Sequence, residues 1–186
     1  MYVKRYLPTF ITGTRLALVP VLLACAALGQ GTAVVALIAL CFFSDLVDGF
    51  LARYWRVVSD AGARLDSWAD FTFYLAIPLA GWWAFPAITG REAPYFAALV
   101  ASIVVPPLLA LAKFHRVPSY HTWGAKLSAA SVGIGVLLLF AFDLPWPFRI
   151  ATGITVTAAL EETAITLVLD TPRSNVRSLW HVLRRH

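Results

Sequence analysis

Four aspartates form two closely spaced pairs in an otherwise apolar part of the chain, within the stretches SDLVDGFLAR and GARLDSWAD. Asp45 and Asp48 fall on one stripe of a predicted helix, because residues three or four apart share a helical face. Asp66 and Asp70 share a stripe of the next predicted helix in the same way. A short connection between the two helices favours stripes that face each other. We therefore expect four carboxylates to converge near one end of these helices.

Such a cluster requires positive charge to compensate it. Each carboxylate placed in a membrane costs at least about 2.5 kcal/mol, and like charges this close repel one another. A single Asp near a helix end is more simply explained as a cap or a surface charge. Four together, with Arg53 close by, indicate bound divalent cations. Oxygen ligands without a neighbouring His or Cys favour Mg²⁺, Mn²⁺ or Ca²⁺ over zinc.

Small residues accompany the acidic ones on the same stripes: Gly49, Ala52 and Gly62. Alone they indicate close packing of two membrane helices. Interleaved with Asp and Arg53, they indicate the floor of a ligand cleft. Metal ions, an arginine and a carboxylate that accepts a proton are the groups that phosphoryl transfer uses.

The elements that must hold these residues are membrane helices. The 186 residues are 60% hydrophobic and 13% charged, whereas about 25% of residues are charged in soluble domains. We predict an all-α integral membrane protein with six transmembrane helices, an N-terminal interfacial segment that ends near Pro8, and a single domain, 1–186. The predicted spans, each close to the length that crosses a bilayer, are 10–30, 32–54, 64–84, 94–112, 125–142 and 147–169.

Basic residues indicate how these helices are oriented. With six spans, every Lys and Arg except Arg91 and Arg149 falls on one side. By the positive-inside rule, that side is cytoplasmic and carries both termini and the acidic cluster. The net charge of +5 then reflects a basic rim facing anionic membrane lipid, and no nucleic-acid motif accompanies it.

The full spacing is Asp45-x2-Asp48-Gly49-x2-Ala52-Arg53-x8-Gly62-x3-Asp66-x3-Asp70. It resembles, at every position, the motif of the CDP-alcohol phosphotransferase family, which comprises integral membrane enzymes of phospholipid synthesis. Six spans with the motif across the second and third are similar to that family too. The stretch LPTFITGTRLALVP also resembles the start of bacterial phosphatidylglycerophosphate synthases, with Thr9 where those usually have Asn.

The resemblance implies a role for each acidic residue. Asp45, Asp48 and Asp66 are expected to be metal ligands. Asp70 is expected to complete a site for two Mg²⁺ or Mn²⁺ ions and to act as the general base. The implied reaction transfers a phosphatidyl group from CDP-diacylglycerol to a small polar alcohol and releases CMP.

The resemblance also implies how the donor is held. Arg53 is expected to contact its pyrophosphate, and Asp45 also belongs to the CDP site. Gly49, Ala52 and Gly62 are expected to let the cytidine nucleotide lie close to the backbone. A homodimer in the bacterial inner membrane, with its active site facing the cytoplasm, is implied as well.

The acceptor alcohol is less well defined. Lys113, Arg116 and Lys126 are expected to hold its phosphate if it is glycerol 3-phosphate or inositol phosphate, although ordinary loop charges would look the same. LDSWADF has Ser67 and Phe71 where the DPxADK form of glycerophosphate synthases has Pro and Lys. Serine, inositol phosphate and other alcohols therefore remain open.

Two further functions fit the same residues. One is a transferase that uses a soluble CDP-alcohol donor and diacylglycerol as acceptor. The other is an ion or proton transporter, but the aspartates cluster near one membrane face and no pair of broken helices accompanies them. Glu161 and Glu162, midway along the sixth span, are explained either by a function or by pairing with Arg15 or another buried donor.

Overall fold

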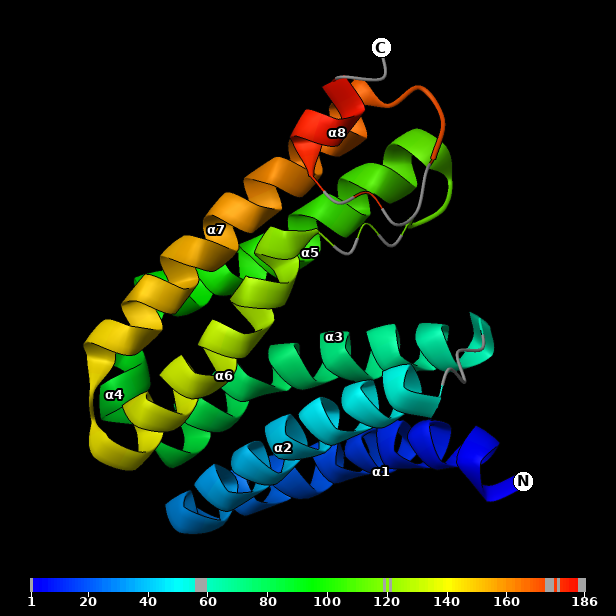
Figure 1. The fold of residues 1–186 in the computed structure, drawn as a ribbon. Coiled ribbons are helices and arrows are strands. Elements are labelled where there is room, and N and C mark those ends of the chain that lie inside the picture. The colour runs from blue at the N-terminus through cyan, green and yellow to red at the C-terminus, as the bar shows by residue number, and fades with distance from the viewer. Residues whose placement is uncertain are drawn as a thin grey trace. The chain divides into compact units, whose positions relative to one another are not determined.

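The computed structural model of the chain is helical (Figure 1). It describes the backbone of residues 2–55, 60–118, 120, 122–172, 176 and 178–183, and their side chains except those of 2–11, 46, 48–55, 60–67 and 183. The described residues contain no strand. Their helices are α1 (Tyr2–Ala27), α2 (Gly31–Trp55), α3 (Asp60–Ala84), α4 (Pro86–Arg91), α5 (Ala93–Phe114), α6 (Trp123–Phe142), α7 (Pro145–Val168) and α8 (Leu179–Leu183).

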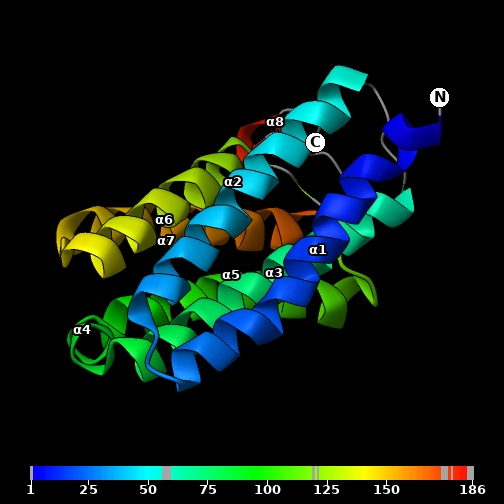
Figure 2. The same cartoon turned by 90° about the horizontal axis from the view of Figure 1, so that it is seen from below.

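The chain forms two compact units, Met1–Arg91 and Glu92–His186. In the first unit, α1 packs along both α2 and α3, whereas α2 and α3 touch each other much less. Figure 2 shows α1 beside α3 from below. The core is lined by small and branched side chains, among them Leu22, Ile38 and Ile77. The helix that precedes the two acidic stretches is thus the main packing partner of both.

A tight turn sets the register of α1 and α2. Gly29 has a φ of 68°, a left-handed conformation that glycine adopts without steric cost. A side chain at Gly31 would lie 2.9 Å from the ring of Phe85, which follows α3. This close approach places the end of α3 at the level of the α1–α2 turn.

In the second unit, α7 packs against both α5 and α6, and α8 packs on α7. Gly135 of α6 lets the backbone of Phe148 on α7 approach, because an added Cβ would lie 2.9 Å from Phe148 Cα. Thr122 caps the start of α6 by accepting a hydrogen bond from Ala125 N at 3.1 Å. This bond satisfies one of the backbone N–H groups that lack a partner inside the helix at its start.

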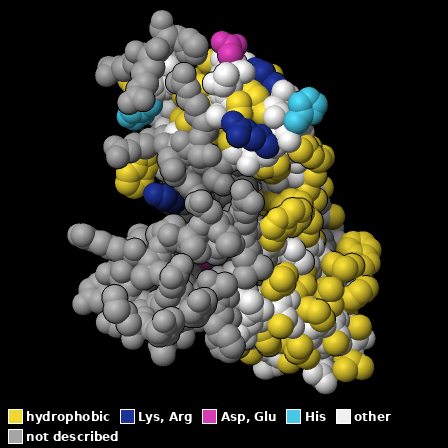
Figure 3. Space-filling view, turned by 90° about the vertical axis from the view of Figure 1, so that its right-hand side faces the viewer, with side chains coloured by type: hydrophobic (Ala, Val, Ile, Leu, Met, Phe, Trp, Pro, Cys, Tyr) yellow, Lys and Arg dark blue, Asp and Glu magenta, His cyan; other side chains and the backbone are white. Residues whose placement is uncertain are grey.

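The fold is that of an integral membrane protein. Three helices of the described residues are long and apolar enough to cross a membrane, namely α5, α6 and α7, and Thr12–Ala27 and Gly31–Asp45 form shorter apolar helical stretches. Figure 3 shows a broad area of hydrophobic side chains on one face, with few charged ones among them. Exposed tryptophans near helix ends, as expected at membrane interfaces, are Trp82, Trp83, Trp123, Trp146 and Trp180.

The all-helical fold is confirmed, and three of the predicted spans, 94–112, 125–142 and 147–169, match the membrane-length helices α5, α6 and α7. The count of six spans stays a prediction, and the N-terminus differs from the expectation. The interfacial segment was expected to end near Pro8, but α1 runs without a break from Tyr2 to Ala27. A proline removes one backbone hydrogen bond from a helix, and membrane helices tolerate this loss. The segment before Pro8 is therefore the first part of α1.

Candidate active site

Three charged residues of the first unit lie at one level: Arg15 on α1, Asp45 on α2 and Asp70 on α3. At 1.5 Å per residue, each lies about 20 Å along its helix from the end at the α1–α2 turn. Helix α2 runs antiparallel to α1 and α3, and the contact of Phe85 with Gly31 sets the ends of α2 and α3 at one level. The packing of α1 against both acidic helices therefore brings an arginine to the two aspartates.

Arg15 joins the two acidic helices through one nitrogen atom. Its Nη1 donates to Asp45 Oδ1 at 2.5 Å and to Asp70 Oδ1 at 2.6 Å. The Arg15 side chain is only 2% exposed, whereas those of Asp45 and Asp70 are 34% and 35% exposed. The cation is thus buried among helices, while solutes can reach the carboxylates.

An aromatic layer lies one helical turn from these residues, on the side of the α1–α2 turn. The ring of Phe42 lies 5.4 Å from that of Phe73 and 5.9 Å from that of Tyr74, centroid to centroid. Phe42 precedes Asp45 by one turn on α2, and the other two rings follow Asp70 by one turn on α3. Apolar rings on this side exclude water and strengthen the electrostatic interactions of the carboxylates.

The described acidic residues fit a divalent cation. Two carboxylate oxygens from different helices already converge on one positive group, Arg15 Nη1, and such oxygens are the ligands that Mg²⁺ and Mn²⁺ prefer. Among the residues that the structure describes, no group of three or more His, Cys, Asp or Glu gathers around one point. Asp45 and Asp70 would supply two oxygen ligands to such an ion.

The rest of the predicted motif lies on α2 and α3, but its side chains fall outside those described. α2 carries Asp48, Gly49, Ala52 and Arg53 after Asp45, and α3 carries Gly62 and Asp66 before Asp70. On both helices these residues lie on the side of Asp45 and Asp70 away from the α1–α2 turn. The predicted ligands and nucleotide contacts therefore remain predictions, set on the two helices that Arg15 joins.

The predicted acceptor residues belong to the second unit. Lys113 Nζ donates to the carbonyl oxygens of Thr166 and Leu167 at 3.1 and 2.8 Å, which caps the end of α7. Lys126 Nζ lies 5.1 Å from the ring centroid of Trp123. Lys126 and Arg116 are exposed. Lys113 therefore has a structural role, because it caps the end of α7.

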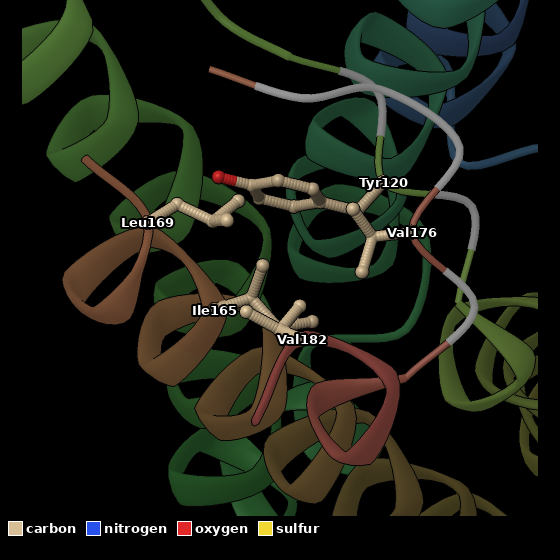
Figure 4. Close-up of a cluster of buried hydrophobic side chains, with 5 residues drawn as sticks. All are labelled: Tyr120, Ile165, Leu169, Val176 and Val182. Atoms are coloured by element: carbon tan, nitrogen blue, oxygen red, sulfur yellow. The ribbon is translucent and has the colours of Figure 1, made fainter. Parts of the chain in front are cut away.

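The two glutamates of the sixth predicted span lie in α7. Glu161 Oε1 accepts a hydrogen bond from Leu179 N at 3.1 Å, at the start of α8. Beside it, a small apolar cluster holds the end of the chain on α7 (Figure 4); its buried residues are Tyr120, Ile165, Leu169, Val176 and Val182. Glu161 therefore has a structural partner.

The residue that sequence reasoning missed is Arg15. The sequence suggests it only as a partner of Glu161 and Glu162, and the structure pairs it with Asp45 and Asp70. The available signal was its position: it is the single charged residue of the apolar stretch from residue 10 to residue 30, and a charge in a membrane helix is rarely without function.

Comparison with known proteins identifies the family of the chain. A family model described as CDP-alcohol phosphatidyltransferase matches residues 5–168. Two sequences from Mycobacterium tuberculosis, from strains CDC 1551 and H37Rv, are each named "Probable phosphatidylglycerophosphate synthase". Each is 30% identical over 175 residues, which cover 86% of this chain and 77% of the relative. No solved structure matches the chain. The family match includes both acidic helices and extends to the end of α7, and the chain therefore belongs to the CDP-alcohol phosphatidyltransferase family.

Proposed function

We propose that this chain transfers the phosphatidyl group of CDP-diacylglycerol to glycerol 3-phosphate and releases CMP. Phosphatidyl transfer to an alcohol follows from the family, and the acceptor is the part that we infer. Glycerol 3-phosphate is favoured because the Mycobacterium relatives are named phosphatidylglycerophosphate synthases. The observation that supports the site is the pair of partly exposed carboxylates, Asp45 and Asp70, joined by buried Arg15.

The acidic residues of α2 and α3 are proposed to hold two divalent cations, Mg²⁺ or Mn²⁺. Asp45, Asp48, Asp66 and Asp70 are the proposed ligands, since their spacing repeats the family motif. When bound, these cations supply neutralisation of the phosphate oxygens. The aromatic layer around Phe42 keeps water from one side of the site.

Asp70 is proposed to accept the proton of the attacking hydroxyl. Its side chain is 35% exposed, so an acceptor alcohol can reach it. The hydroxyl oxygen forms a bond to the phosphorus that carries the lipid, and the bond from this phosphorus to the CMP oxygen breaks. Arg53 is proposed to hold the donor's pyrophosphate, as a planar guanidinium suits phosphate oxygens.

The remaining parts of the proposal concern architecture. Six spans, with both termini and the acidic site at the cytoplasmic face of a bacterial inner membrane, are consistent with the helix positions and with the distribution of Lys and Arg. We also propose one functional domain, because the family match runs through both compact units. A homodimer is proposed from the family alone.

The test is an acceptor panel. The purified chain is given CDP-diacylglycerol and Mn²⁺ with glycerol 3-phosphate, inositol phosphate or serine, and the lipid product is identified by mass spectrometry. We expect phosphatidylglycerophosphate, with CMP in equal amount. Product from another acceptor alone would contradict the proposed acceptor. Product from no acceptor, together with ion flux into liposomes, would contradict the transferase.

A further inference from the structure

The Arg15 guanidinium lies between the two acidic helices, α2 and α3, and contacts a carboxylate on each. Its Nη1 lies within 2.6 Å of Asp45 Oδ1 and of Asp70 Oδ1. The guanidinium reaches this place from a third helix, α1, and is almost fully buried at 2% exposure. No part of the acidic motif on α2 and α3 requires an arginine from α1, so this contact needs its own explanation.

We propose that Arg15 is a positioning residue that gathers Asp45 and Asp70 before metal binds, and that it competes with the divalent cation for their Oδ1 atoms. The inference rests on the metal-dependent site of the proposed function. It gives that site an internal cation whose contacts must be exchanged when the metal enters.

Gathering follows from charge. Two carboxylates on neighbouring helices repel each other, and this repulsion is strong where water is partly excluded. The Arg15 guanidinium between them replaces repulsion with two charge-assisted hydrogen bonds. Asp45 and Asp70 therefore stay close in the absence of metal, and the ligand set is formed before the ion arrives.

Competition follows from space. A Mg²⁺ ion binds a carboxylate oxygen at about 2.0–2.1 Å, which is shorter than the contacts that Arg15 makes. An ion bonded to both Oδ1 atoms needs the region that Nη1 now fills. Binding of the ion through these two atoms must therefore move the guanidinium or turn the carboxylates, and either change lowers the affinity for metal.

A purely structural role predicts a different outcome. If Arg15 only pins three helices together, its loss lowers stability equally with and without metal and does not tighten metal binding. If it positions and competes, its loss leaves two repelling carboxylates that a divalent cation restores. The dependence of stability on metal separates the two roles.

The test uses the full chain in detergent micelles without substrate. Arg15→Met removes the charge at similar volume, and binding of Mn²⁺ is measured by the electron paramagnetic resonance signal of the free ion. We expect about tenfold tighter Mn²⁺ binding than in the wild type. We also expect a lower unfolding temperature in EDTA that saturating Mn²⁺ raises back to the wild-type value. Unchanged or weaker Mn²⁺ binding would overturn the proposal.

Two further variants keep the test decisive. Arg149→Met removes an arginine that pairs with Glu92 in the second unit, and it should lower the unfolding temperature without changing Mn²⁺ affinity. Arg15→Lys keeps one charge and serves if Arg15→Met does not fold. Its Mn²⁺ affinity should exceed the wild-type value, and an equal affinity would contradict competition. Because no substrate is present, failure of transfer in the acceptor panel and failure of this inference are separate results.

Discussion

Each of the two units contains an arginine paired with carboxylates. In one unit the arginine is buried, and in the other the carboxylate is buried. In the first unit, Arg15 is 2% exposed and its partners Asp45 and Asp70 are about a third exposed. In the second, Glu92 is fully buried while Arg149 is 42% exposed. Arg149 bonds both oxygens of Glu92, from Nε at 2.8 Å and from Nη2 at 2.9 Å, and lies 5.3 Å from the ring of Tyr95.

The difference in burial of the carboxylates separates a candidate reactive site from a structural ion pair. A buried carboxylate whose two oxygens are both bonded to one guanidinium offers no position for a substrate or an ion. Asp45 and Asp70 each bond the buried Arg15 through one oxygen and are partly exposed. Solutes can therefore still reach these two carboxylates. The Arg15 cluster is therefore the proposed reactive site, and the Glu92–Arg149 pair at the start of α5 and α7 holds these two helices together.

The largest expected effect breaks the first cluster. Asp70→Asn removes the proposed base, and general base catalysis contributes about 10²–10⁴ in rate. We expect CMP release to fall by at least about 100-fold, with CDP-diacylglycerol binding largely retained. Turnover is measured with glycerol 3-phosphate, and donor binding by equilibrium dialysis. Near-normal turnover would show that another group takes the proton.

The next effect breaks the second cluster. Arg149→Met removes the guanidinium that bonds both oxygens of the buried Glu92 carboxylate, and breaking a buried ion pair in this way costs about 3–5 kcal/mol. Glu92→Gln leaves an arginine that is partly in solvent, so its cost should be smaller. Thermal unfolding in detergent should therefore rank wild type above Glu92→Gln and Glu92→Gln above Arg149→Met. Equal losses would mean that the burial difference does not control the pair.

A smaller effect separates two lysines of the predicted acceptor site. Lys113→Met removes a cap from α7 and should lower the unfolding temperature, with little change in the KM for glycerol 3-phosphate. Lys126→Met should instead raise that KM by about tenfold, because a charge-assisted contact to phosphate is worth about 1.5 kcal/mol or more. Both are measured on the same preparations. A raised KM for Lys113→Met but not for Lys126→Met would show that Lys113, and not Lys126, contacts the acceptor phosphate.

The smallest effect concerns Tyr120, between α5 and α6. Burial raises its pKa above the ordinary value of 10.0, and its hydrogen bond with Thr166 partly offsets this. The neutral phenol is favoured in the fold, so its stabilisation is complete below pH 10 and is lost as pH rises above 10 and the unfolded chain ionises. Tyr120→Phe should lose about 1 kcal/mol at neutral pH and show a weaker decline above pH 10. Unfolding temperatures from pH 7 to 11 check this, and identical declines would contradict it.

The sequence predicted the helices well because long apolar runs are local signals. The sequence also predicted the acidic motif, since three- and four-residue spacing alone puts Asp45 and Asp48 on one helical stripe. It did not predict the arginine that pairs with the aspartates. Arg15 reaches Asp45 and Asp70 because α1 packs along both α2 and α3, and no pattern within α1 specifies that packing. The continuation of α1 through Pro8 was missed for a similar reason, as proline is a weaker break in a membrane helix than in water.

The most direct test of the account is CMP release by the wild type from CDP-diacylglycerol and glycerol 3-phosphate, with and without divalent cation. The account predicts CMP and phosphatidylglycerophosphate in equal amounts with Mn²⁺ or Mg²⁺, no product in EDTA, and recovery when Mn²⁺ is added back. Transfer that continues at the same rate in EDTA, or no transfer under any of these conditions, would contradict it.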